Sequence, residues 1–242
     1  MKILAIDIGN ARIKAGIYYR GAILCAWTGP STRAGAGRCL QAFAGRREIE
    51  SVGIVSVVPS LTPLLVNGFK KLKKPVKVVR PSDSRDMRVT YRPVSQLGAD
   101  RYANAVGAAA RYGTPVIVVD VGTAVTVDAV VPGPRFVGGV ILPGPELMGK
   151  ALAQGTARLS EVPLMASPRL IGNSTVACIQ SGVIHGLNGA VGYMVEHMKR
   201  ELGRSTRVVV TGGGARWIRP VLKGAIYDAH LTLKAVFRLV FS

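Results

Sequence analysis

The sequence predicts an α/β fold built from two similar halves, and three observations support this. Short apolar segments typical of strands alternate with helix-like segments along the 242 residues. An apolar strand that ends in Asp-x-Gly, followed by two more strand-like segments, occurs at Asp7 and again at Asp120. A break at Gly113-Thr114-Pro115 separates the two copies. We therefore expect one lobe over residues 1–113 and a duplicated second lobe over residues 114–242.

The elements of the first half follow from periodicity and turn residues. We expect strands over residues 3–8, 12–19, 22–27, 52–57 and 76–79, and helices over residues 32–43, from about Ser60, and over 98–112. Three consecutive strands followed by alternating helices and strands predict a mixed sheet with helices packed against it.

The second half repeats the pattern and then extends it. We expect strands over residues 116–119, 125–131, 136–142 and 208–210, helices over 145–154 and 174–202, a helix after Gly213, and a terminal strand-helix unit at 231–234. Glycines at positions 182, 186, 189 and 192 recur three or four residues apart in the long helix. This spacing favours the close approach of another helix or of a second subunit on that face.

The charge balance raises the question of a nucleic acid partner. The chain has 32 Lys and Arg against 13 Asp and Glu, a net charge of +19, and such a surplus favours anionic partners. The cations are scattered except for one cluster from Lys70 to Arg80, and no aromatic RNA-binding motif or zinc-finger spacing accompanies them. A solvated basic surface is therefore the favoured interpretation, and nucleic acid is not the favoured partner.

The cysteines and the apolar segments indicate the compartment. Cys25, Cys39 and Cys178 are far apart and form no metal-binding spacing, so we expect small buried residues in a reducing environment. The N-terminal strand reaches Asp7 too soon for a signal peptide, and no apolar segment approaches the length of a membrane span. These features predict a cytoplasmic protein without a membrane segment.

The scarce acidic residues are more informative than the surplus of basic ones. Four of the seven aspartates lie in or beside apolar, glycine-containing segments: Asp7, Asp100, Asp120 and Asp128. Burying a carboxylate is costly without a partner. An Asp at a strand end before a Gly-containing hairpin offers a carboxylate together with backbone N–H groups, as a phosphate and cation site requires. The alternative is an ordinary turn in which Asp caps its own backbone.

Three glycine-containing turns together resemble a known superfamily. The turns at Asp7 and Asp120, with the segment Thr211-Gly212-Gly213-Gly214-Ala215, resemble the phosphate-1, phosphate-2 and adenosine elements of the acetate kinase, sugar kinase, Hsp70 and actin superfamily. This resemblance implies two duplicated ribonuclease H-like lobes, the actin-like ATPase fold, with ATP in the cleft between them.

The ordered set of motifs resembles the type III pantothenate kinases over essentially the whole chain. The motifs are Asp7-Ile8-Gly9-Asn10, Gly98-Ala99-Asp100-Arg101, Asp120-Val121-Gly122-Thr123, Gly138-Gly139 to Pro143-Gly144, Asn173-Ser174-Thr175 and Thr211-Gly212-Gly213. The resemblance implies ATP-dependent phosphorylation of pantothenate to 4′-phosphopantothenate, the first step of coenzyme A biosynthesis. It also implies a homodimer with the pantothenate site near the subunit interface.

The resemblance assigns a role to each matching residue. Asp100 matches the general base, Arg101 a substrate contact, Asp120 the ligand of a monovalent cation (K⁺ or NH₄⁺), and Thr123 a phosphate contact. Further substrate-binding positions are Tyr91, Gly98, Ala99 and Thr175. Asp7, Ile8, Gly9, Asn10, Ala11, Arg12, Ile13 and Lys14 correspond to the segment around the ATP phosphates, with Asp7 orienting Mg²⁺, and Gly212 and Gly213 complete the nucleotide site.

Several of these residues also have ordinary structural interpretations. Asp100 would suit the first turn of a helix because a carboxylate there interacts favourably with the helix dipole, and Arg101 would then be a surface residue. Tyr91 alone would be a core-edge aromatic. Asp128 lies on the second strand of its hairpin and is assigned a structural role.

One departure from the family pattern keeps an alternative open. The family usually has a hydroxyl residue after the Asn of the first motif, and here Ala11 takes that position. Losing one such hydrogen bond typically costs about 0.5 to 1.5 kcal/mol, which would weaken ATP binding without abolishing turnover. The alternatives are a kinase of another small alcohol, or a basic nucleic-acid-binding or transcription-accessory protein on an inactive kinase fold.

Overall fold

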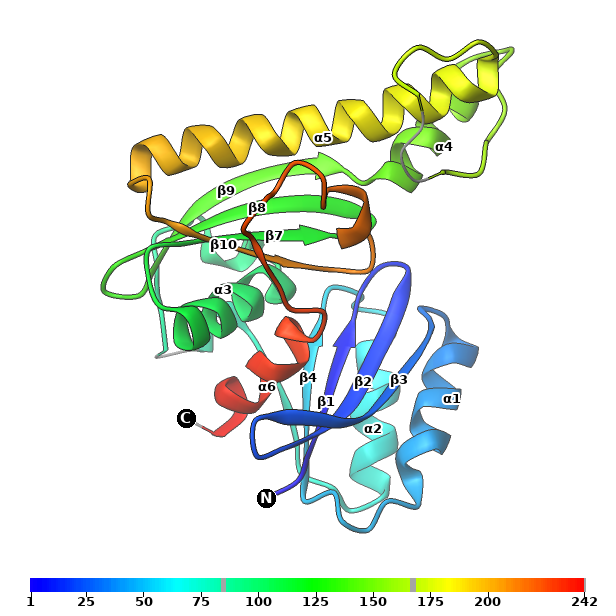
Figure 1. Ribbon diagram of the computed structural model, residues 1–242. Helices are drawn as coiled ribbons and strands as arrows, with labels where there is room; N and C mark the ends of the chain where they lie inside the picture. Colours follow the sequence, from blue (N-terminus) through cyan, green and yellow to red (C-terminus); the bar gives the residue numbers. More distant parts are fainter. Residues whose placement is uncertain (84–85, 166–168, 242) are drawn as a thin grey trace. The chain divides into compact units, whose positions relative to one another are not determined.

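The computed structural model describes residues 1–83, 86–165 and 169–241 and divides into two compact units (Figure 1). The first unit contains residues 1–113 and 132–137 together with the C-terminal segment from His230, and the second contains residues 114–131 and 138–229. Packing therefore groups the C-terminal segment with the beginning of the chain. The two lobes predicted from the sequence, residues 1–113 and 114–242, are continuous in the chain and stay a prediction.

The first unit is organised around a five-stranded mixed sheet. Its strands are β1 (Ile3–Ile8), β2 (Arg12–Tyr19), β3 (Ala22–Pro30), β4 (Ser51–Ser56) and β5 (Val76–Val78), in the order β3-β2-β1-β4-β5. β1 pairs antiparallel with β2 and parallel with β4. Every residue of β1 except Asp7 is buried. The central strand is therefore covered on both faces, which explains why its sequence is a nearly continuous apolar run.

Helices cover both faces of this sheet. On one face, α1 (Arg33–Ala44) and α2 (Thr62–Lys71) place Phe43, Leu65 and Phe69 in one apolar cluster with the β1 side chains Leu4 and Ile6. The other face carries α6 (Leu231–Phe241), which packs against β1, β2, β4 and α3 (Ala99–Tyr112). The first unit is thus a three-layer α/β arrangement.

Glycines allow α6 to approach its neighbours closely. A Cβ atom at Gly53 in β4 would lie 2.3 Å from Val236 Cγ1, and a Cβ at Gly107 in α3 would lie 2.9 Å from Ala235 Cβ. Thr232 Oγ1 donates a buried hydrogen bond of 2.7 Å to Asn104 Oδ1. These contacts tie the end of the chain to the helix that follows Gly98.

The second unit contains most of a six-stranded sheet covered by one long helix. Its strands are β7 (Val116–Val121), β8 (Ala124–Val131), β10 (Arg207–Thr211), β11 (Ile226–Tyr227) and most of β9 (Arg135–Pro143), in the order β11-β10-β7-β8-β9-β6. The short strand β6 (Arg88–Val89) pairs with the first residues of β9, which belong to the first unit. α5 (Thr175–Leu202) lies along the sheet, and α4 (Pro145–Gly155) packs against α5 (Figure 1).

Most predicted elements are confirmed, and two predictions at the C-terminal end are wrong. The helix predicted after Gly213 is only a 3₁₀ turn over Ala215–Trp217. Pro220 explains this, because a proline disfavours helical backbone in the residue before it. Leu231 to Lys234 form the first turn of α6, and the preceding strand is β11.

The cysteine prediction is partly wrong. All three cysteines are free, and Cys39 is buried, with burial raising its pKa to about 12. Cys25 is half-buried and Cys178 is exposed.

The helices of the described residues are all too short or too polar to span a membrane.

Replacing Gly53 with Ala should destabilise the protein. The new methyl group would overlap Val236 and Val240 of α6, and overpacking of this kind typically costs about 1 to 3 kcal/mol. Gly37→Ala is the matched control, because Gly37 lies exposed in α1 with no atom within 4 Å of its Cβ position; it should gain about 0.4 to 1 kcal/mol. Urea unfolding measures both, and equal effects would contradict the close packing of α6.

Candidate active site

The turn after β1 presents backbone at one end of the first unit's sheet. Asp7 pairs with Lys14 across the hairpin, and the N–H of Gly9 donates to the carbonyl oxygen of Arg12 at 3.0 Å. Asn10, Ala11 and Arg12 are exposed at this turn, while Asp7 is half-buried. The hairpin thus places one carboxylate beside accessible backbone groups, which suits an anion or a cation-bound phosphate.

The start of α3 lies at the same end of the sheet. A Cβ atom at Gly98 would lie 3.8 Å from Val57 Cγ1, and the N–H of Val57 donates to the carbonyl oxygen of Ile8 at 3.1 Å. Because Val57 follows β4 and Ile8 ends β1, Gly98 lies near the carboxyl ends of two neighbouring parallel strands. The structure therefore brings Asp100 and Asp7 to one edge of the sheet.

The Asp100 carboxylate folds back over the N-terminus of its own helix. Its Oδ1 accepts a hydrogen bond of 2.7 Å from the N–H of Arg101. A Cβ atom at Gly98 would lie only 2.5 Å from the same oxygen. Any side chain at position 98 would therefore displace the carboxylate, which explains why a glycine stands two residues before Asp100.

Burial has the largest effect on the pKa of the Asp100 carboxyl group. Desolvation raises its pKa above the ordinary aspartate value, and the backbone hydrogen bond and positive charge of Arg101 offset part of this rise. A carboxylate with a raised pKa is a stronger base than an exposed one. The geometry therefore supplies a carboxylate that can take a proton from a nearby hydroxyl group.

Arg101 lies over two neighbouring aromatic rings, Tyr91 and Phe136, whose centroids are 6.2 Å apart in an edge-to-face arrangement. Its Cζ lies 5.4 Å from the centroid of the Tyr91 ring and 5.7 Å from that of Phe136, and the side chain is buried. The carbonyl oxygen of Phe136 accepts bonds of 3.0 Å from the N–H and 2.9 Å from Oγ1 of Thr90. These contacts place the rings and fix the guanidinium beside Asp100 through cation–π attraction.

Phe136 is a site residue that the sequence analysis missed. In the sequence it is one aromatic residue at the start of an apolar strand, so nothing separates it from core residues. Its position against Arg101 depends on the pairing of β6 with β9. No local signal could have identified it.

In the second unit, two turns meet beside Asp120. The N–H of Gly144 donates to the carbonyl oxygen of Thr123 at 2.8 Å. A Cβ atom at Gly212, whose φ is +91°, would lie 2.4 Å from Asp120 Oδ1. Thr123 and Gly213 are exposed. One carboxylate and the backbone of two glycine-containing turns therefore gather at the ends of β7 and β10.

The predicted substrate residue Thr175 lies apart from these turns. It is the exposed first residue of α5, next to the capping residue Ser174, whose Oγ accepts from the N–H of Ala177 at 3.2 Å. This end of α5 lies beside α4 and extends beyond the strands of the second unit (Figure 1). The structure does not place Thr175 in the group formed by Asp120, Thr123 and Gly212.

Asp128 is enclosed in the second unit, as its structural assignment requires. The residue is 1% exposed. A Cβ atom at Gly139 would lie 2.4 Å from Asp128 Oδ1, so the glycine leaves room for the buried carboxylate. This explains part of the Gly138-Gly139 motif without a ligand.

Ser31 is a second residue that the sequence analysis missed. Its N–H donates to the carbonyl oxygen of Ala11 at 3.0 Å, which places it against the Asp7 turn. Its hydroxyl oxygen is buried and has no hydrogen-bond partner in the described part of the chain. Leaving a buried hydroxyl without a partner typically costs about 1 to 3 kcal/mol, and a hydrogen-bond partner bound at the turn would remove that cost.

The carboxylate of Asp7 suits a Mg²⁺ ion that is bound jointly by protein and by substrate phosphates. Over residues 1–83, 86–165 and 169–241, no group of three or more His, Cys, Asp or Glu side chains is arranged to enclose an ion. Mg²⁺ usually binds through one or two carboxylates together with substrate phosphates and water. Asp7, a single carboxylate beside exposed backbone, fits that pattern.

Comparisons with known proteins match nearly the whole chain to one family. A family model described as type III pantothenate kinase matches residues 3–197. Proteins of that name from Moorella thermoacetica and Akkermansia muciniphila are both 38% identical, over 99% and 98% of this chain and 98% and 97% of their own lengths.

Solved structures share the fold at lower identity. A Baf family transcriptional activator from Campylobacter jejuni has a TM-score of 0.63 at 21% identity and covers 98% of this chain and 96% of its own. A ROK family glucokinase from Streptomyces griseus, in complex with glucose and AMPPNP, has a TM-score of 0.57 at 16% identity, with 99% of each chain covered. The actin-like ATPase fold predicted from the sequence is thereby confirmed.

Replacing Asp100 with Asn should stabilise the protein at neutral pH. Because burial raises the folded pKa above the unfolded value of about 3.9, the folded state favours the protonated acid. The stability that this provides is present in acid and is lost as pH rises through the folded pKa. The advantage of the variant should therefore grow as pH rises above the unfolded pKa of about 3.9, which urea unfolding at acid and neutral pH measures. A variant that is less stable than wild type at the higher pH would contradict this.

Proposed function

The chain belongs to the type III pantothenate kinase family, and we propose that it transfers a phosphoryl group from ATP to pantothenate, forming 4′-phosphopantothenate for coenzyme A biosynthesis. The observation that carries the proposal is the half-buried Asp100, placed beside Arg101 at the sheet edge that also holds the Asp7 turn. Phosphoryl transfer depends mainly on positioning and charge neutralisation, and these residues supply both.

In the proposed reaction, Asp100 accepts the proton of the primary hydroxyl of pantothenate. The hydroxyl oxygen then bonds to the terminal phosphorus of ATP, the bond from that phosphorus to the bridging oxygen breaks, and ADP leaves. Burial supports this role because it raises the pKa of the carboxyl group. Gly98 supports it sterically, since its missing side chain leaves the carboxylate free to lie over the helix N-terminus.

Arg101 is proposed to bind the carboxylate of pantothenate. A guanidinium group forms two parallel hydrogen bonds with a carboxylate, and the rings of Tyr91 and Phe136 hold this one in place. Tyr91, Gly98 and Ala99 are the other proposed substrate contacts in the first unit. Arg101 is adjacent to Asp100 in the chain, so both residues can contact the same bound substrate molecule.

Glycine-containing turns are the proposed ATP contacts within each unit. In the first unit, Asp7 to Lys14 provide backbone for the phosphates. In the second unit, Thr123, Gly212 and Gly213 are the proposed nucleotide contacts. Mg²⁺, when bound beside Asp7, supplies charge neutralisation to the phosphates. Asp120, with the carbonyl groups next to it, is the proposed ligand for K⁺ or NH₄⁺.

We also propose a cytoplasmic homodimer. The exposed side of α5 contains Gly182, Gly186 and Gly189, which have no atom within 4 Å of their Cβ positions, together with Tyr193, which is 60% exposed. α4 adds exposed Leu147 and Leu152. An apolar helical surface with small residues suits a second copy of the chain, and it would bring Thr175 into the interface.

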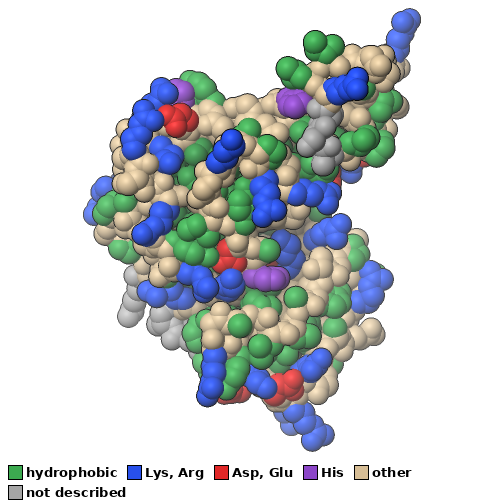
Figure 2. Space-filling view, in the orientation of Figure 1, with side chains coloured by type: hydrophobic (Ala, Val, Ile, Leu, Met, Phe, Trp, Pro, Cys, Tyr) green, Lys and Arg blue, Asp and Glu red, His purple; other side chains and the backbone are tan. Residues whose placement is uncertain are grey.

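The nucleic-acid alternative has little support from the structure. On the face shown in Figure 2, Lys and Arg side chains are dispersed and do not form a single patch. The carboxylates at Asp100 and Asp120 are both present, so the residues expected for catalysis and cation binding are intact. An active kinase therefore explains the sequence and the structure better than an inactive fold.

The test of the proposed function is ADP release with pantothenate, ATP and Mg²⁺, with and without KCl. We expect pantothenate-dependent turnover that rises when K⁺ is added. Asp100→Asn should lower kcat by about 100-fold or more, the usual contribution of a general base, with little change in the KM for ATP.

A matched variant separates this effect from misfolding. Glu196→Gln makes the same chemical change at an exposed carboxylate of the second unit, where Arg200 and Arg204 lie 3.3 and 2.9 Å away, and it should keep wild-type kcat. Absence of pantothenate-dependent turnover in the native chain would overturn the proposed function. Equal loss in both variants would overturn the role of Asp100.

Ser31 is proposed to supply the hydroxyl group that Ala11 lacks. Ser31→Ala should raise the KM for ATP by about 3- to 10-fold, the effect of one lost hydrogen bond, and leave kcat unchanged. Adding Ala11→Ser to that variant should restore the KM. Ser51→Ala is the control, because Ser51 in β4 also has a buried hydroxyl without a partner in the described part of the chain; the same KM change there would show that Ser31 plays no specific role.

A further inference from the structure

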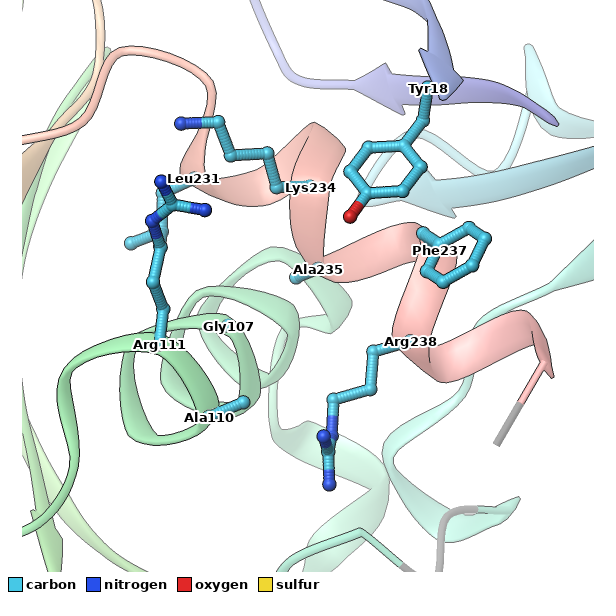
Figure 3. Close-up of a pocket in the computed structure, with 9 residues that line it drawn as sticks. All are labelled: Tyr18, Gly107, Ala110, Arg111, Leu231, Lys234, Ala235, Phe237 and Arg238. Atoms are coloured by element: carbon cyan, nitrogen blue, oxygen red, sulfur yellow. The ribbon is translucent and has the colours of Figure 1, made fainter. Parts of the chain in front are cut away.

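We propose that a pocket in the first unit binds an organic phosphate that carries an aromatic ring. The pocket has a volume of about 470 Å³ and lies between α3, α6 and β2 (Figure 3). Its principal lining residues are Tyr18, Ala110, Arg111, Lys234, Phe237 and Arg238. The volume is within the range of small-molecule sites, roughly 300 to 1,000 Å³.

The pocket is separate from the candidate active site. Tyr18 pairs with Ile3 at the start of β1, whereas Lys14 pairs with Asp7 near its end, so Tyr18 lies about 13 Å along β2 from Lys14. Arg111 is eleven residues after Asp100 on α3, or about 16 Å along the helix. The pocket therefore lies toward the opposite end of both elements.

Small residues produce the hollow. Gly107 and Ala235 bring α3 and α6 into close contact, with 2.9 Å from a Cβ position at Gly107 to Ala235 Cβ. Ala110, one turn further along α3, is exposed and has too short a side chain to fill the space that opens beside this contact. The hollow is open to solvent at Ala110, and its volume leaves room for a ligand.

The charged lining selects an anion. Arg111, Lys234 and Arg238 are the charged lining residues, and none of the described residues that line the pocket is acidic. Arg238 Nε lies 3.5 Å from Asp86 Oδ1, so its charge is partly neutralised. Arg111 and Lys234 extend on the same side of the pocket (Figure 3). An arginine fork and an ammonium group together suit a phosphate, which offers several oxygens.

The aromatic lining selects a ring. Tyr18 and Phe237 form a stacked pair with centroids 4.4 Å apart and an interplanar angle of 28°, and the Tyr18 hydroxyl points into the pocket (Figure 3). A planar ligand group can extend such a stack and gain the attraction of an aromatic pair. Inorganic phosphate would leave this wall and most of the volume unused, so the pocket suits a ring and a phosphate in one molecule.

The experiment titrates phenyl phosphate by calorimetry into the full chain, with Mg²⁺ and a non-hydrolysable ATP analogue present to occupy the nucleotide site. We expect saturable binding that is at least about tenfold tighter than that of inorganic phosphate or phenol, because each lacks one of the two recognised groups. Absence of saturable binding, or equal binding of inorganic phosphate, would overturn the proposal.

Two variants locate the binding to the pocket. Arg111→Gln combined with Lys234→Gln should weaken binding by about tenfold or more, whereas Lys70→Gln with Lys71→Gln, at the exposed end of α2, should not. Ala110→Leu should also weaken binding by filling the space without changing charge, and Ala42→Leu on the exposed side of α1 is its control. If Ala110→Leu leaves binding unchanged, the ligand binds to surface charge and the proposal fails.

The outcome is independent of the proposed kinase function. Arg111, Lys234 and Ala110 are outside the proposed catalytic residues, so kcat of these variants should stay within about twofold of wild type. Asp100→Asn should still bind phenyl phosphate. Loss of turnover in Asp100→Asn with retained binding distinguishes the two sites, and failure of either proposal can be recognised without the other.

Discussion

The close packing of α6 against glycines on β4 and α3 is the contact on which the first unit depends. Gly53 and Gly107 lack side chains where Val236 and Ala235 approach, so a helix from the end of the chain can lie directly on the sheet and on α3. The buried hydrogen bond from Thr232 to Asn104 adds a polar contact to this apolar packing. Buried polar groups need hydrogen-bond partners. The bond between Thr232 and Asn104 therefore specifies the position of α6 along α3.

The position of α3 has two consequences at its two ends. At its start, Gly98 lies near Val57, and Asp100 and Arg101 follow at the edge of the sheet. At its end, the contact of Gly107 with Ala235 leaves an open pocket beside Arg111. One helix thus carries a candidate catalytic carboxylate and part of a second candidate site about 16 Å away.

Two residues of the candidate active site carry polar groups whose burial reduces stability. Asp100 is half-buried, and the desolvation of its carboxylate raises its pKa and disfavours its charged form. The Ser31 hydroxyl is buried without a partner in the described part of the chain. Both features reduce stability, and departures from the local rules of protein structure are expected at functional sites.

The sequence by itself determined most strands and helices and the turns at Asp7 and Asp120, because periodicity and turn chemistry act over a few residues. The helix predicted after Gly213 is absent because Pro220 disfavours it. Cys178 was predicted to be buried and is exposed. Only the tertiary structure decided that Phe136 lies against Arg101, that Ser31 lies against Ala11, and that α6 packs on the first unit. These contacts join residues from different elements, and no local pattern encodes which distant element will fill the space that a glycine leaves.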